Sequence, residues 1–495
     1  MKNCFLIVSF IAFNSSLVAK PVFQEPLQES VPSSLKIDTA YNYIQFYDSA
    51  VVKRFVAHFD NVEKDKLVIL HFGDSHIQAE YSTSYTRNYL QNDYGDGGRG
   101  MIVNYSAAKT YSSVNYTTTK RGKWKFAKSF QIPPKIPLGI TGMTVETSDK
   151  EAELYFHFKQ PLPEYEYKIT VFFENNETTS AFHLLVDTNV YTFTTQKLRG
   201  LHQNYIECSY FGNIHEISLQ VGANIDRLVG ANIDKLVDGV DFRFYGINIE
   251  KSGNQGVVYH SLGVGAAPMQ SVLYLDRLTE QAQVLKPDIA LLDFGTNDIL
   301  YYNQIEANLP SIISRIIKRL RDINPGMSII LTSTQDLFRY GRYITVAAKF
   351  RDMINSLART EHVMFWNWYD LSGGLHSIRD WYDAGYAQQD GIHLTTKGYA
   401  VKGTLLYSSI KNTIQFVKNN PALQQHIVPV KDYSAVLEQY ADDFKPAITH
   451  KVKSGDTLSA LSRNYHTSVR AIKQANGLKR DFLRVGQILT IPTGR

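Results

Sequence analysis

Three residues of types used in nucleophilic catalysis follow one another along the chain in the order Ser75, Asp390 and His393. A serine attacks an acyl group when a histidine takes its proton and a carboxylate orients that histidine. The short spacing between Asp390 and His393 lets both side chains point the same way from one turn. Taken alone, an Asp-x-x-His pair is a weak signal, because most such pairs are surface residues. Together the three residues predict acyl transfer from Ser75.

The sequence before Ser75 indicates how this serine is placed. A mostly apolar run over 68–72 leads into Gly73 and Asp74, and a polar stretch with helical character covers 78–91. This pattern predicts a buried parallel strand, a tight turn at Gly73 and then a helix. Ser75 would lie near a helix N-terminus, where N–H groups stabilise a developing anion. On this stretch alone, an N-cap serine is an equally weighted interpretation.

Acyl transfer also requires hydrogen-bond donors for the oxyanion of the tetrahedral intermediate. The candidates are the N–H groups of Ser75 and Gly265 and the side-chain amide of Asn297. Asn297 follows a predicted strand over 288–294, where a turn role is the commoner alternative. Gly263 remains an alternative to Gly265 as the backbone donor.

The elements around these residues predict an α/β fold. Buried strands are expected within 256–266, which ends in a small-residue turn, and at 288–294, 328–332 and 362–368, and an amphipathic helix is expected over 312–320. Alternating strands and helices are typical of a doubly wound parallel sheet, which binds ligands at the carboxyl ends of its strands. A further helix is predicted over 38–59. The glycine-rich segment 95–100 is interpreted as a turn near the site.

Residues 105–250 have a different pattern. Short alternating runs separated by turn residues predict an inserted β-sandwich. A tandem octapeptide over 221–236 is interpreted as a local duplication that lengthens one loop. The last residues form a separate small module, and 421–449 are a linker.

The start of the chain and its composition narrow the class of protein. Residues 1–19 are typical of an export signal, which predicts a periplasmic, cell-envelope or extracellular protein. Its removal would leave Cys208 as the one cysteine, so no intrachain disulfide is expected. No later segment is apolar enough to span a bilayer, so no integral membrane segment is expected in the mature protein. The formal net charge of +5 does not suggest nucleic acid. No metal-ligand cluster and no cofactor are predicted.

Four sequence blocks together resemble the SGNH/GDSL hydrolase family. Gly-Asp-Ser-His at 73–76 matches the first block, Gly-Thr-Asn-Asp at 295–298 the third, and Asp390 with His393 the last. The second block, 263–266, departs from the usual pattern, because Val264 and Ala267 stand where that pattern has a polar residue and Thr. The resemblance covers about half of the chain. It implies an SGNH serine hydrolase with Gly265 as the backbone oxyanion donor.

Two finer resemblances bear on the substrate. The insertion between the first two blocks is similar to that of the peptidoglycan O-acetylesterase branch, which carries a carbohydrate-module-like domain there. The C-terminal module resembles a LysM repeat with βααβ order, which implies binding to peptidoglycan or another N-acetylglucosamine-containing glycan. The expected order is a signal peptide (1–19), a flexible leader (20–37), the N-terminal hydrolase segment (38–104), the β-sandwich (105–250), the C-terminal hydrolase segment (251–420), the linker (421–449) and LysM (450–495).

These resemblances imply an exported serine esterase that removes O-acetyl groups from cell-wall glycan, with peptidoglycan as the expected substrate, through an acetyl-enzyme on Ser75. The alternatives are an inactive peptidoglycan-binding protein and an esterase for another acetylated polysaccharide or lipid. His71 and His76 are expected to pack or hydrogen-bond in the core. Asp74 is expected to brace the turn and Asp336 to cap a helix. Core packing is likewise expected for three tryptophans, Trp366, Trp368 and Trp381.

Overall fold

The computed structural model describes residues 32–493, except 223–240, 301–302, 340, 439–444, 466, 468, 477 and 479. The predicted signal peptide, most of the leader and nearly all of the tandem octapeptide lie outside the described residues. Within the described part of the chain, no helix is both long enough and apolar enough to cross a membrane.

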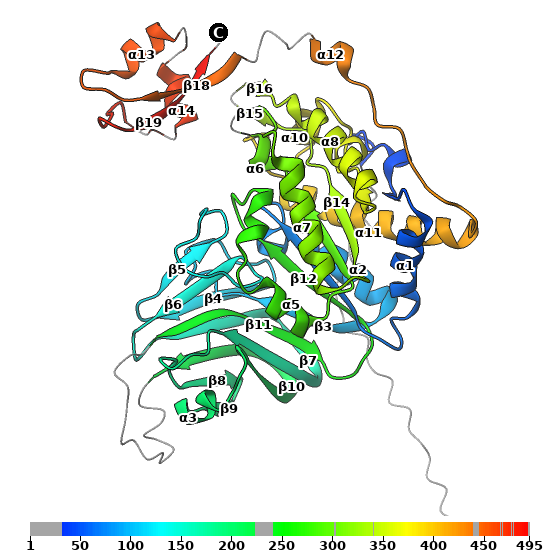
Figure 1. The fold of residues 1–495 in the computed structure, drawn as a ribbon, viewed down its shortest axis with the longest axis vertical. Helices are drawn as coiled ribbons and strands as arrows, with labels where there is room; N and C mark the ends of the chain where they lie inside the picture. The colour runs from blue at the N-terminus through cyan, green and yellow to red at the C-terminus, as the bar shows by residue number, and fades with distance from the viewer. Residues whose placement is uncertain are drawn as a thin grey trace, which may run out of the picture. The chain divides into compact units, whose positions relative to one another are not determined.

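A parallel sheet forms the centre of the hydrolase region (Figure 1). Its strand order is β1-β17-β14-β13-β2-β12-β3. Five of its parallel strands are almost wholly buried, as expected for a sheet covered on both faces. They are β2 (Leu67–Gly73), β12 (Val257–Gly263), β13 (Ile289–Asp293), β14 (Ser328–Thr332) and β17 (Met364–Trp366).

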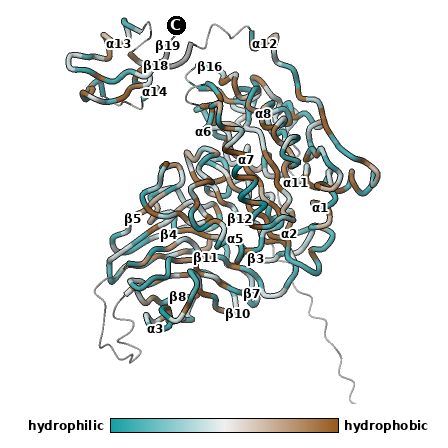
Figure 2. The backbone as a smooth tube through the Cα atoms, viewed as in Figure 1, coloured by the Kyte–Doolittle hydropathy of each residue, from teal (hydrophilic) through white to brown (hydrophobic). Residues whose placement is uncertain are grey.

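Helices cover both faces of this sheet. Successive residues of a strand point to opposite faces, so neighbouring residues of β2 pack against different helices. Ile69 of β2 belongs to a core cluster with residues of α1 (Ser49–Asp60) and α11 (Thr396–Asn419). Its neighbour Leu70 belongs to the other cluster, with residues of α7 (Leu309–Ile323) and α8 (Val346–Thr360). Hydrophobic and hydrophilic residues are interspersed along α7 and α11 in Figure 2, as expected for helices that bury one side. The predicted doubly wound fold is thus confirmed.

The remaining elements of the hydrolase region are short, apart from α2. They are η1 (Thr39–Tyr41), η2 (Gln78–Glu80), α2 (Thr83–Tyr94), η3 (Met269–Tyr274), α5 (Leu278–Leu285), α6 (Thr296–Ile299), β15 (Phe338–Arg339), β16 (Arg342–Tyr343), α9 (Trp368–Leu371), α10 (Ser377–Asp383) and α12 (Ser434–Glu438).

The helix predicted over 38–59 is wrong in its first half. Residues 44–45 form an edge strand, β1 (Ile44–Gln45), which pairs antiparallel with β17. The helix begins only after Asp48, whose carboxylate accepts a hydrogen bond from the Ala50 N–H at 2.7 Å. A capping carboxylate satisfies a helix N–H, so this aspartate sets the start of α1.

The insertion forms two layers from two long strands, β7 and β10. The first half of β7 pairs with β4, whereas its second half pairs with β11, and β10 pairs along both halves. Ring centroids of Phe173 and Phe182 lie 5.4 Å apart across the interior, and those of Phe156 and Phe244 lie 6.1 Å apart. The elements are β4 (Tyr116–Arg121), β5 (Lys125–Lys128), β6 (Met143–Thr147), β7 (Glu153–Phe173), β8 (Phe182–Val186), β9 (Asn189–Phe193), α3 (Thr195–Arg199), β10 (Tyr205–Val221) and β11 (Phe242–Lys251).

The glycine-rich segment 95–100 is not the predicted turn near the site. It lies mostly in β3 (Asp96–Ile102), which pairs parallel with β12 and antiparallel with β11. A Cβ at Gly97 would lie 3.0 Å from backbone atoms of Gly256, so no larger side chain fits there. Glycine lets the strands approach closely. Through β3 the insertion and the hydrolase region share one sheet.

The C-terminal module has the predicted βααβ order. It contains β18 (Lys445–Lys451), α13 (Leu458–Asn464), α14 (Val469–Ala475) and β19 (Ile488–Thr493), and its two strands pair antiparallel. Its small core is closed by buried aliphatic side chains, among them Leu461, Ile472 and Ile491.

Candidate active site

Ser75, His393 and Asp390 meet at the carboxyl edge of the parallel sheet. Ser75 follows the end of β2, and its Oγ lies 2.9 Å from Nε2 of His393. The other ring nitrogen, Nδ1, lies 2.7 Å from Oδ2 of Asp390. With Nδ1 protonated, Nε2 is free to accept the serine proton, which is the tautomer that base catalysis requires. Side chains up to 318 positions apart in sequence therefore form one continuous hydrogen-bonded chain.

The turn that carries Asp390 and His393 is fixed by its neighbours. Gly391 has φ +66°, and a Cβ there would lie 2.1 Å from the carbonyl oxygen of Phe338. The Gly391 carbonyl accepts a hydrogen bond from the Phe338 N–H, and the Ile392 carbonyl accepts one from the Gln335 side chain. Only glycine combines this backbone conformation with so close an approach. The residues on both sides of it are thereby held in place.

Asp390 is kept ionised by the hydrogen bonds it accepts. Partial burial raises the pKa of this carboxyl, but bonds from the His393 ring and from two backbone N–H groups outweigh that effect. Those N–H groups belong to Ile392 and His393, and both lie 2.9 Å from Oδ1. The pKa is lowered to about 2. The carboxylate can therefore orient His393 and stabilise its cation at any ordinary pH.

The turn at Ser75 is held by Asp74 rather than by a following helix. The Asp74 side chain accepts the His76 N–H at 2.9 Å, and its carbonyl accepts the N–H groups of Ile77 and Gln78. The helix predicted over 78–91 begins only at Thr83, after η2. Burial raises the pKa of Asp74 to about 7. The expected bracing role of Asp74 agrees with these contacts.

Gly73 is required for close packing and not for a special backbone angle. A Cβ at Gly73 would lie 2.3 Å from Cγ1 of Ile77 and 2.8 Å from the Asp293 carbonyl oxygen. Its φ is not positive, so the sharp turn predicted from conformational freedom has a different cause. The space left by the missing side chain lets the chain fold back beside β13.

The three expected oxyanion donors differ in what they already bind. Within the described residues, no hydrogen bond uses the Ser75 N–H. The Gly265 N–H donates to Oε1 of Gln78 at 2.6 Å. The Asn297 amide donates to Oδ2 of Asp74 and to the Ala267 carbonyl, both at 3.2 Å. An oxyanion would thus find one open donor and two donors with protein acceptors.

Gly263 differs from Gly265 in its surroundings. Gly263 is the last residue of β12 and pairs with Gly73 in the parallel ladder. A Cβ at Gly263 would lie 2.1 Å from the backbone nitrogen of Gln78, so the Gly263 backbone is packed against the turn that follows Ser75. Gly265 lies two residues beyond the strand, in the following loop.

Gln78 and Tyr111 are site neighbours that the sequence did not single out. The Gln78 side chain is buried, and its Nε2 donates to Oγ1 of Thr110 at 2.8 Å. A Cβ at Gly265 would lie 3.0 Å from Gln78 Oε1 and 3.6 Å from the Tyr111 hydroxyl. Gln78 thus joins the nucleophile turn to the loop between β3 and β4, and Tyr111 of that loop approaches Gly265. No local motif marks such long-range pairing.

A buried histidine lies against the site histidine. The ring centroids of His76 and His393 are 5.3 Å apart, and Nδ1 of His76 lies 3.1 Å from the Tyr399 hydroxyl. Burial, followed by the nearby His393, lowers the pKa of His76 well below its ordinary value. His76 is therefore neutral and packs as the sequence suggested.

Beneath the site, one buried cation balances one buried carboxylate. Nζ of Lys402 lies 2.8 Å from Oδ2 of Asp293, and Nε2 of His71 lies 3.3 Å from the same oxygen. Burial raises the pKa of Asp293, but Lys402 and His71 outweigh it and hold the pKa far below its usual range. The cluster joins α11 to β13, so it fixes the helix that follows His393.

The remaining candidates are structural in this fold. The three candidate tryptophans near the C-terminal strands are buried, with Trp368 packed against Trp366 and Trp381 at 5.2 and 5.7 Å between ring centroids. Asp336 is buried, and its carboxylate accepts the Ile378 N–H at 3.2 Å, near the start of α10. Among the described residues, no group of three or more His, Cys, Asp or Glu side chains is placed to hold a metal ion.

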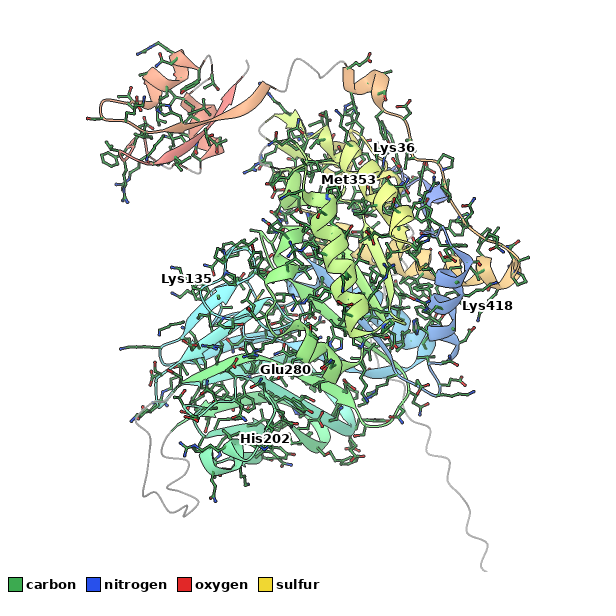
Figure 3. The ribbon with its side chains drawn as sticks, in the orientation of Figure 1. Lys36, Lys135, His202, Glu280, Met353 and Lys418 are labelled. Atoms are coloured by element: carbon green, nitrogen blue, oxygen red, sulfur yellow. The ribbon has the colours of Figure 1, made fainter. Side chains whose placement is uncertain are left out.

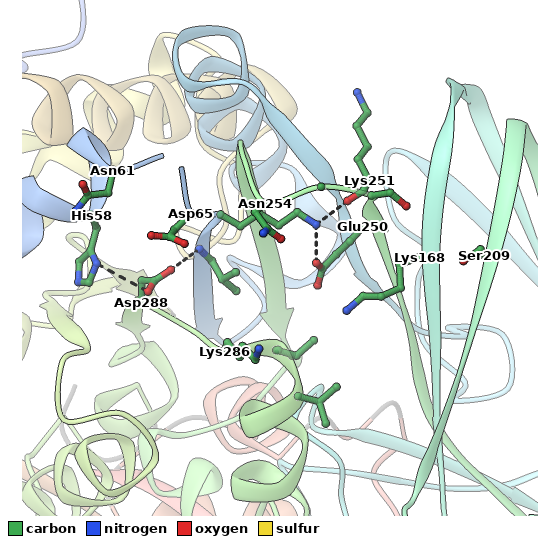
Figure 4. A pocket seen from close by; sticks show the side chains of 16 residues that line it. His58, Asn61, Asp65, Lys168, Ser209, Glu250, Lys251, Asn254, Lys286 and Asp288 are labelled. Atoms are coloured by element: carbon green, nitrogen blue, oxygen red, sulfur yellow. Dashed lines mark hydrogen bonds and ion pairs between the residues drawn. The ribbon is translucent and has the colours of Figure 1, made fainter. Parts of the chain in front are cut away.

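A polar hollow of about 700 Å³ lies at the other end of β2 (Figure 4). It is lined by residues that precede β2 and β13 and by residues of β7, β10 and β11. Several of its charges are paired, since Nζ of Lys66 lies 2.9 Å from Glu250 and Nζ of Lys251 lies 2.7 Å from Asp96. This hollow is therefore a polar junction between hydrolase region and insertion, separate from Ser75.

Two family models match parts of this chain. Residues 243–401 match the GDSL-like Lipase/Acylhydrolase family, and residues 450–492 match the LysM domain. The first match includes Gly265, Asn297, Asp390 and His393, and it begins within β11, the last strand of the insertion, so it leaves out Ser75. The chain therefore carries a GDSL-like lipase/acylhydrolase domain of the carboxylic ester hydrolase class, followed by a LysM domain.

Two known proteins are similar to parts of the chain. A solved peptidoglycan O-acetylesterase is 18% identical and superposes with a TM-score of 0.59, over 75% of this chain and 99% of that chain. At this identity the likeness establishes the fold. The probable peptidoglycan endopeptidase LytE of Bacillus subtilis (strain 168) is 51% identical over 43 residues. That match covers 9% of this chain and 13% of the endopeptidase, so it concerns the LysM module alone.

Proposed function

We propose that this protein is an exported serine esterase that removes O-acetyl groups from cell-wall glycan, with peptidoglycan as the substrate. The observation that carries the proposal is the chain of contacts at 2.9 and 2.7 Å from Ser75 through His393 to Asp390. The side chains of His393 and Asp390 are partly exposed, so an ester on a large polymer can reach the serine. The LysM domain supports a glycan as the partner.

In the proposed reaction, Ser75 Oγ attacks the acetyl carbonyl carbon while His393 Nε2 accepts the hydroxyl proton. Asp390 holds the ring and stabilises its cation. The tetrahedral intermediate collapses as His393 returns the proton to the sugar oxygen, which leaves as a free hydroxyl. Water then attacks the acetyl-enzyme and loses a proton to His393. His393 gives this proton to Ser75 Oγ as the second tetrahedral intermediate collapses, and acetic acid leaves and ionises to acetate.

The oxyanion would be held by the N–H groups of Ser75 and Gly265 and by the Asn297 amide. Oε1 of Gln78 already occupies the acceptor position in front of the Gly265 N–H. We therefore expect a bound ester to replace this carboxamide oxygen with its own carbonyl oxygen. The exchange keeps the donor satisfied in both states, which avoids the cost of a buried donor without a partner.

The LysM domain would act by raising the local concentration of glycan at the esterase. A linked binding module makes the second contact intramolecular, so the apparent affinity for a polymer rises without new contacts at the active site. Small soluble esters gain nothing from this effect. Cell-wall association of the protein follows from the same module.

The proposal is tested with Ser75→Ala, using acetate release from O-acetylated peptidoglycan. We expect this variant to lose all measurable acetate release. Ser356→Ala is the matched control, because Ser356 is an exposed serine of α8. Retained activity of Ser75→Ala would refute the assignment of the nucleophile. A wild-type protein that prefers acetylated xylan to peptidoglycan would refute the assignment of the substrate.

A further inference from the structure

The insertion presents a basic aromatic patch, which we define as Lys109, Tyr111, Phe126, Lys128 and Phe130. Two segments contribute to it, the loop between β3 and β4 and the strand β5 with the residue two positions beyond its end. Nζ of Lys128 lies 5.5 Å from the ring centroid of Phe126 and 5.4 Å from that of Phe130. Nζ of Lys109 lies 5.5 Å from the Phe126 ring. The two ammonium groups are thus gathered over one pair of rings.

The patch lies beside the active site on the side of the oxyanion donors. Its Tyr111 hydroxyl is 3.6 Å from the position of a Cβ at Gly265, and the adjacent Thr110 binds the Gln78 side chain. Ser129, the residue after Lys128, lies near Val264, which directly precedes Gly265. Gly142 packs between them, because a Cβ there would lie 3.0 Å from Ser129 Oγ and 2.8 Å from Val264. A polymer bound across Ser75 would therefore extend over the patch.

Two of the three aromatic side chains of the patch are open to solvent. Tyr111 is 49% exposed and Phe130 is 39% exposed. Soluble proteins seldom leave grouped aromatic rings exposed without a binding role. Flat exposed rings match the apolar faces of sugar rings, and an ammonium group close to a ring is drawn to its face.

The two lysines of the patch have no carboxylate partner among the described residues. Within the described part of the chain, no carboxylate oxygen lies within 4.0 Å of Nζ of Lys109 or Lys128. Nζ of Lys128 donates to the Lys109 carbonyl at 3.4 Å, and burial lowers the pKa of this ammonium group. By contrast, Lys125 on the same strand lies 4.0 Å from Glu146. A ligand carboxylate could therefore form ion pairs with the ammonium groups of Lys109 and Lys128.

We infer that the basic aromatic patch is a subsite for a carboxylate-bearing sugar or sugar substituent, adjacent to the acetylated sugar whose ester meets Ser75. The inference rests on the proposed function and adds the chemical class of the neighbouring unit. The rings of Tyr111 and Phe130 contact the sugar, and the ammonium groups of Lys109 and Lys128 bind the carboxylate. A neutral polysaccharide such as xylan would use the rings but not the charges.

The test compares Lys109→Ala/Lys128→Ala with Lys197→Ala, a control that removes an exposed lysine from α3 of the same insertion. A second pair is Phe130→Ala and Phe211→Ala, since Phe211 is 69% exposed on β10. Each full-length variant is assayed on 4-nitrophenyl acetate, on O-acetylated muropeptides that keep their carboxylates and on acetylated xylan.

We expect the double lysine variant to hydrolyse 4-nitrophenyl acetate within about 2-fold of wild type and to raise KM for the muropeptides about 10-fold, which is about 1.4 kcal/mol of binding. Its KM for xylan should change less than 2-fold. Phe130→Ala should raise KM for both glycans, and the controls should change neither. An unchanged muropeptide KM, or an equal rise for xylan, would overturn the inference.

An inhibition assay tests carboxylate binding by the patch without relying on the proposed substrate. Muropeptides without acetyl groups should inhibit 4-nitrophenyl acetate hydrolysis by wild type more strongly than neutral N-acetylglucosamine oligomers do. The difference should vanish in the double lysine variant. If wild type releases no acetate from any glycan, the proposed function fails, and this inhibition still decides whether the patch binds carboxylates.

Figure 3 marks a further lysine on this side of the insertion, Lys135, in the loop between β5 and β6. Lys135 is exposed. We keep it unchanged in every variant, so that the loss of charge is confined to the two lysines that face the rings.

Discussion

Replacing Asp390 by asparagine tests the proposed catalytic chain most directly. The asparagine has the same shape, and its oxygen can still accept the two backbone N–H groups of the turn. Its NH2 group would then face Nδ1 of His393, which at present donates to Oδ2 at 2.7 Å. Because two donors cannot bond to each other, the ring is driven to the tautomer with Nε2 protonated. That nitrogen cannot accept the Ser75 proton.

The size of the effect follows from two contributions. A carboxylate and an imidazolium about 4 Å apart attract by about 4 kcal/mol at an effective dielectric constant of about 20. The two side chains are 41% and 33% exposed, and solvent screening reduces the attraction to about 2 kcal/mol, or about 30-fold in rate. The wrong tautomer adds to this loss, with about 10⁴-fold as the known upper range for such a change. We expect kcat to fall by between about 30-fold and about 10⁴-fold.

The assay is steady-state hydrolysis of 4-nitrophenyl acetate between pH 5 and 9. KM should change less than about 3-fold, since Asp390 stabilises a charge that develops only in the reaction. The Asp390 pKa of about 2 keeps it ionised over this whole range, so its titration should not shape the wild-type profile. Asp383→Asn, at an exposed position in α10, is the control. A kcat of Asp390→Asn within 3-fold of wild type would refute the reasoning.

Three further outcomes are expected. Lys402→Met should lower the free energy of unfolding by about 3–5 kcal/mol in urea titrations, because it leaves Asp293 buried without its cation. Lys418→Met is the control at an exposed ion pair and should lower this free energy by no more than about 1 kcal/mol. Equal losses in the two variants would contradict the argument. Burial raises the pKa of Asp336 to about 8, so the native state holds a proton that the unfolded chain releases above its ordinary value of 3.8. The free energy of unfolding should therefore fall as the pH rises from about 4 to about 8, by at most about 1.4 kcal/mol per pH unit. Asp336→Asn should reduce this pH dependence in unfolding curves measured at pH 5, 6.5 and 8. An unchanged pH dependence would exclude Asp336 as its source. Removal of residues 445–495 should abolish cosedimentation with insoluble peptidoglycan and leave 4-nitrophenyl acetate hydrolysis unchanged, whereas undiminished sedimentation would assign wall binding to another region of the chain.

The chemistry of the site was more predictable from sequence than its surroundings. Ser75, Asp390 and His393 follow from residue type, order and position at strand ends, and the structure brings all three together. Continuous apolar runs predicted the parallel strands, because a strand covered on both faces must be apolar throughout. The catalytic roles of Ser75, Asp390 and His393 stay predictions, as do the domain boundaries.

The errors have a common physical cause, which is dependence on distant partners. Residues 44–45 follow a helical spacing, yet they pair with β17 some 320 positions later. The glycines at 95–100 resemble a loop locally, but they permit contact with the chain at Gly256. The bond from Gly265 to Gln78 likewise joins residues 187 positions apart. No window of sequence contains both members of such pairs.

The strand β3 determines how the insertion can be exchanged or removed. It has a parallel neighbour, β12, on one side and an antiparallel neighbour, β11, on the other. Excising the insertion at its apparent borders would strip β11 away and expose a row of unpaired backbone groups, which is a template for aggregation. A chimaera between relatives should therefore transfer β3 together with the inserted strands. The block to transfer then runs from Gly95, the first glycine after α2, to the start of β12 at Val257.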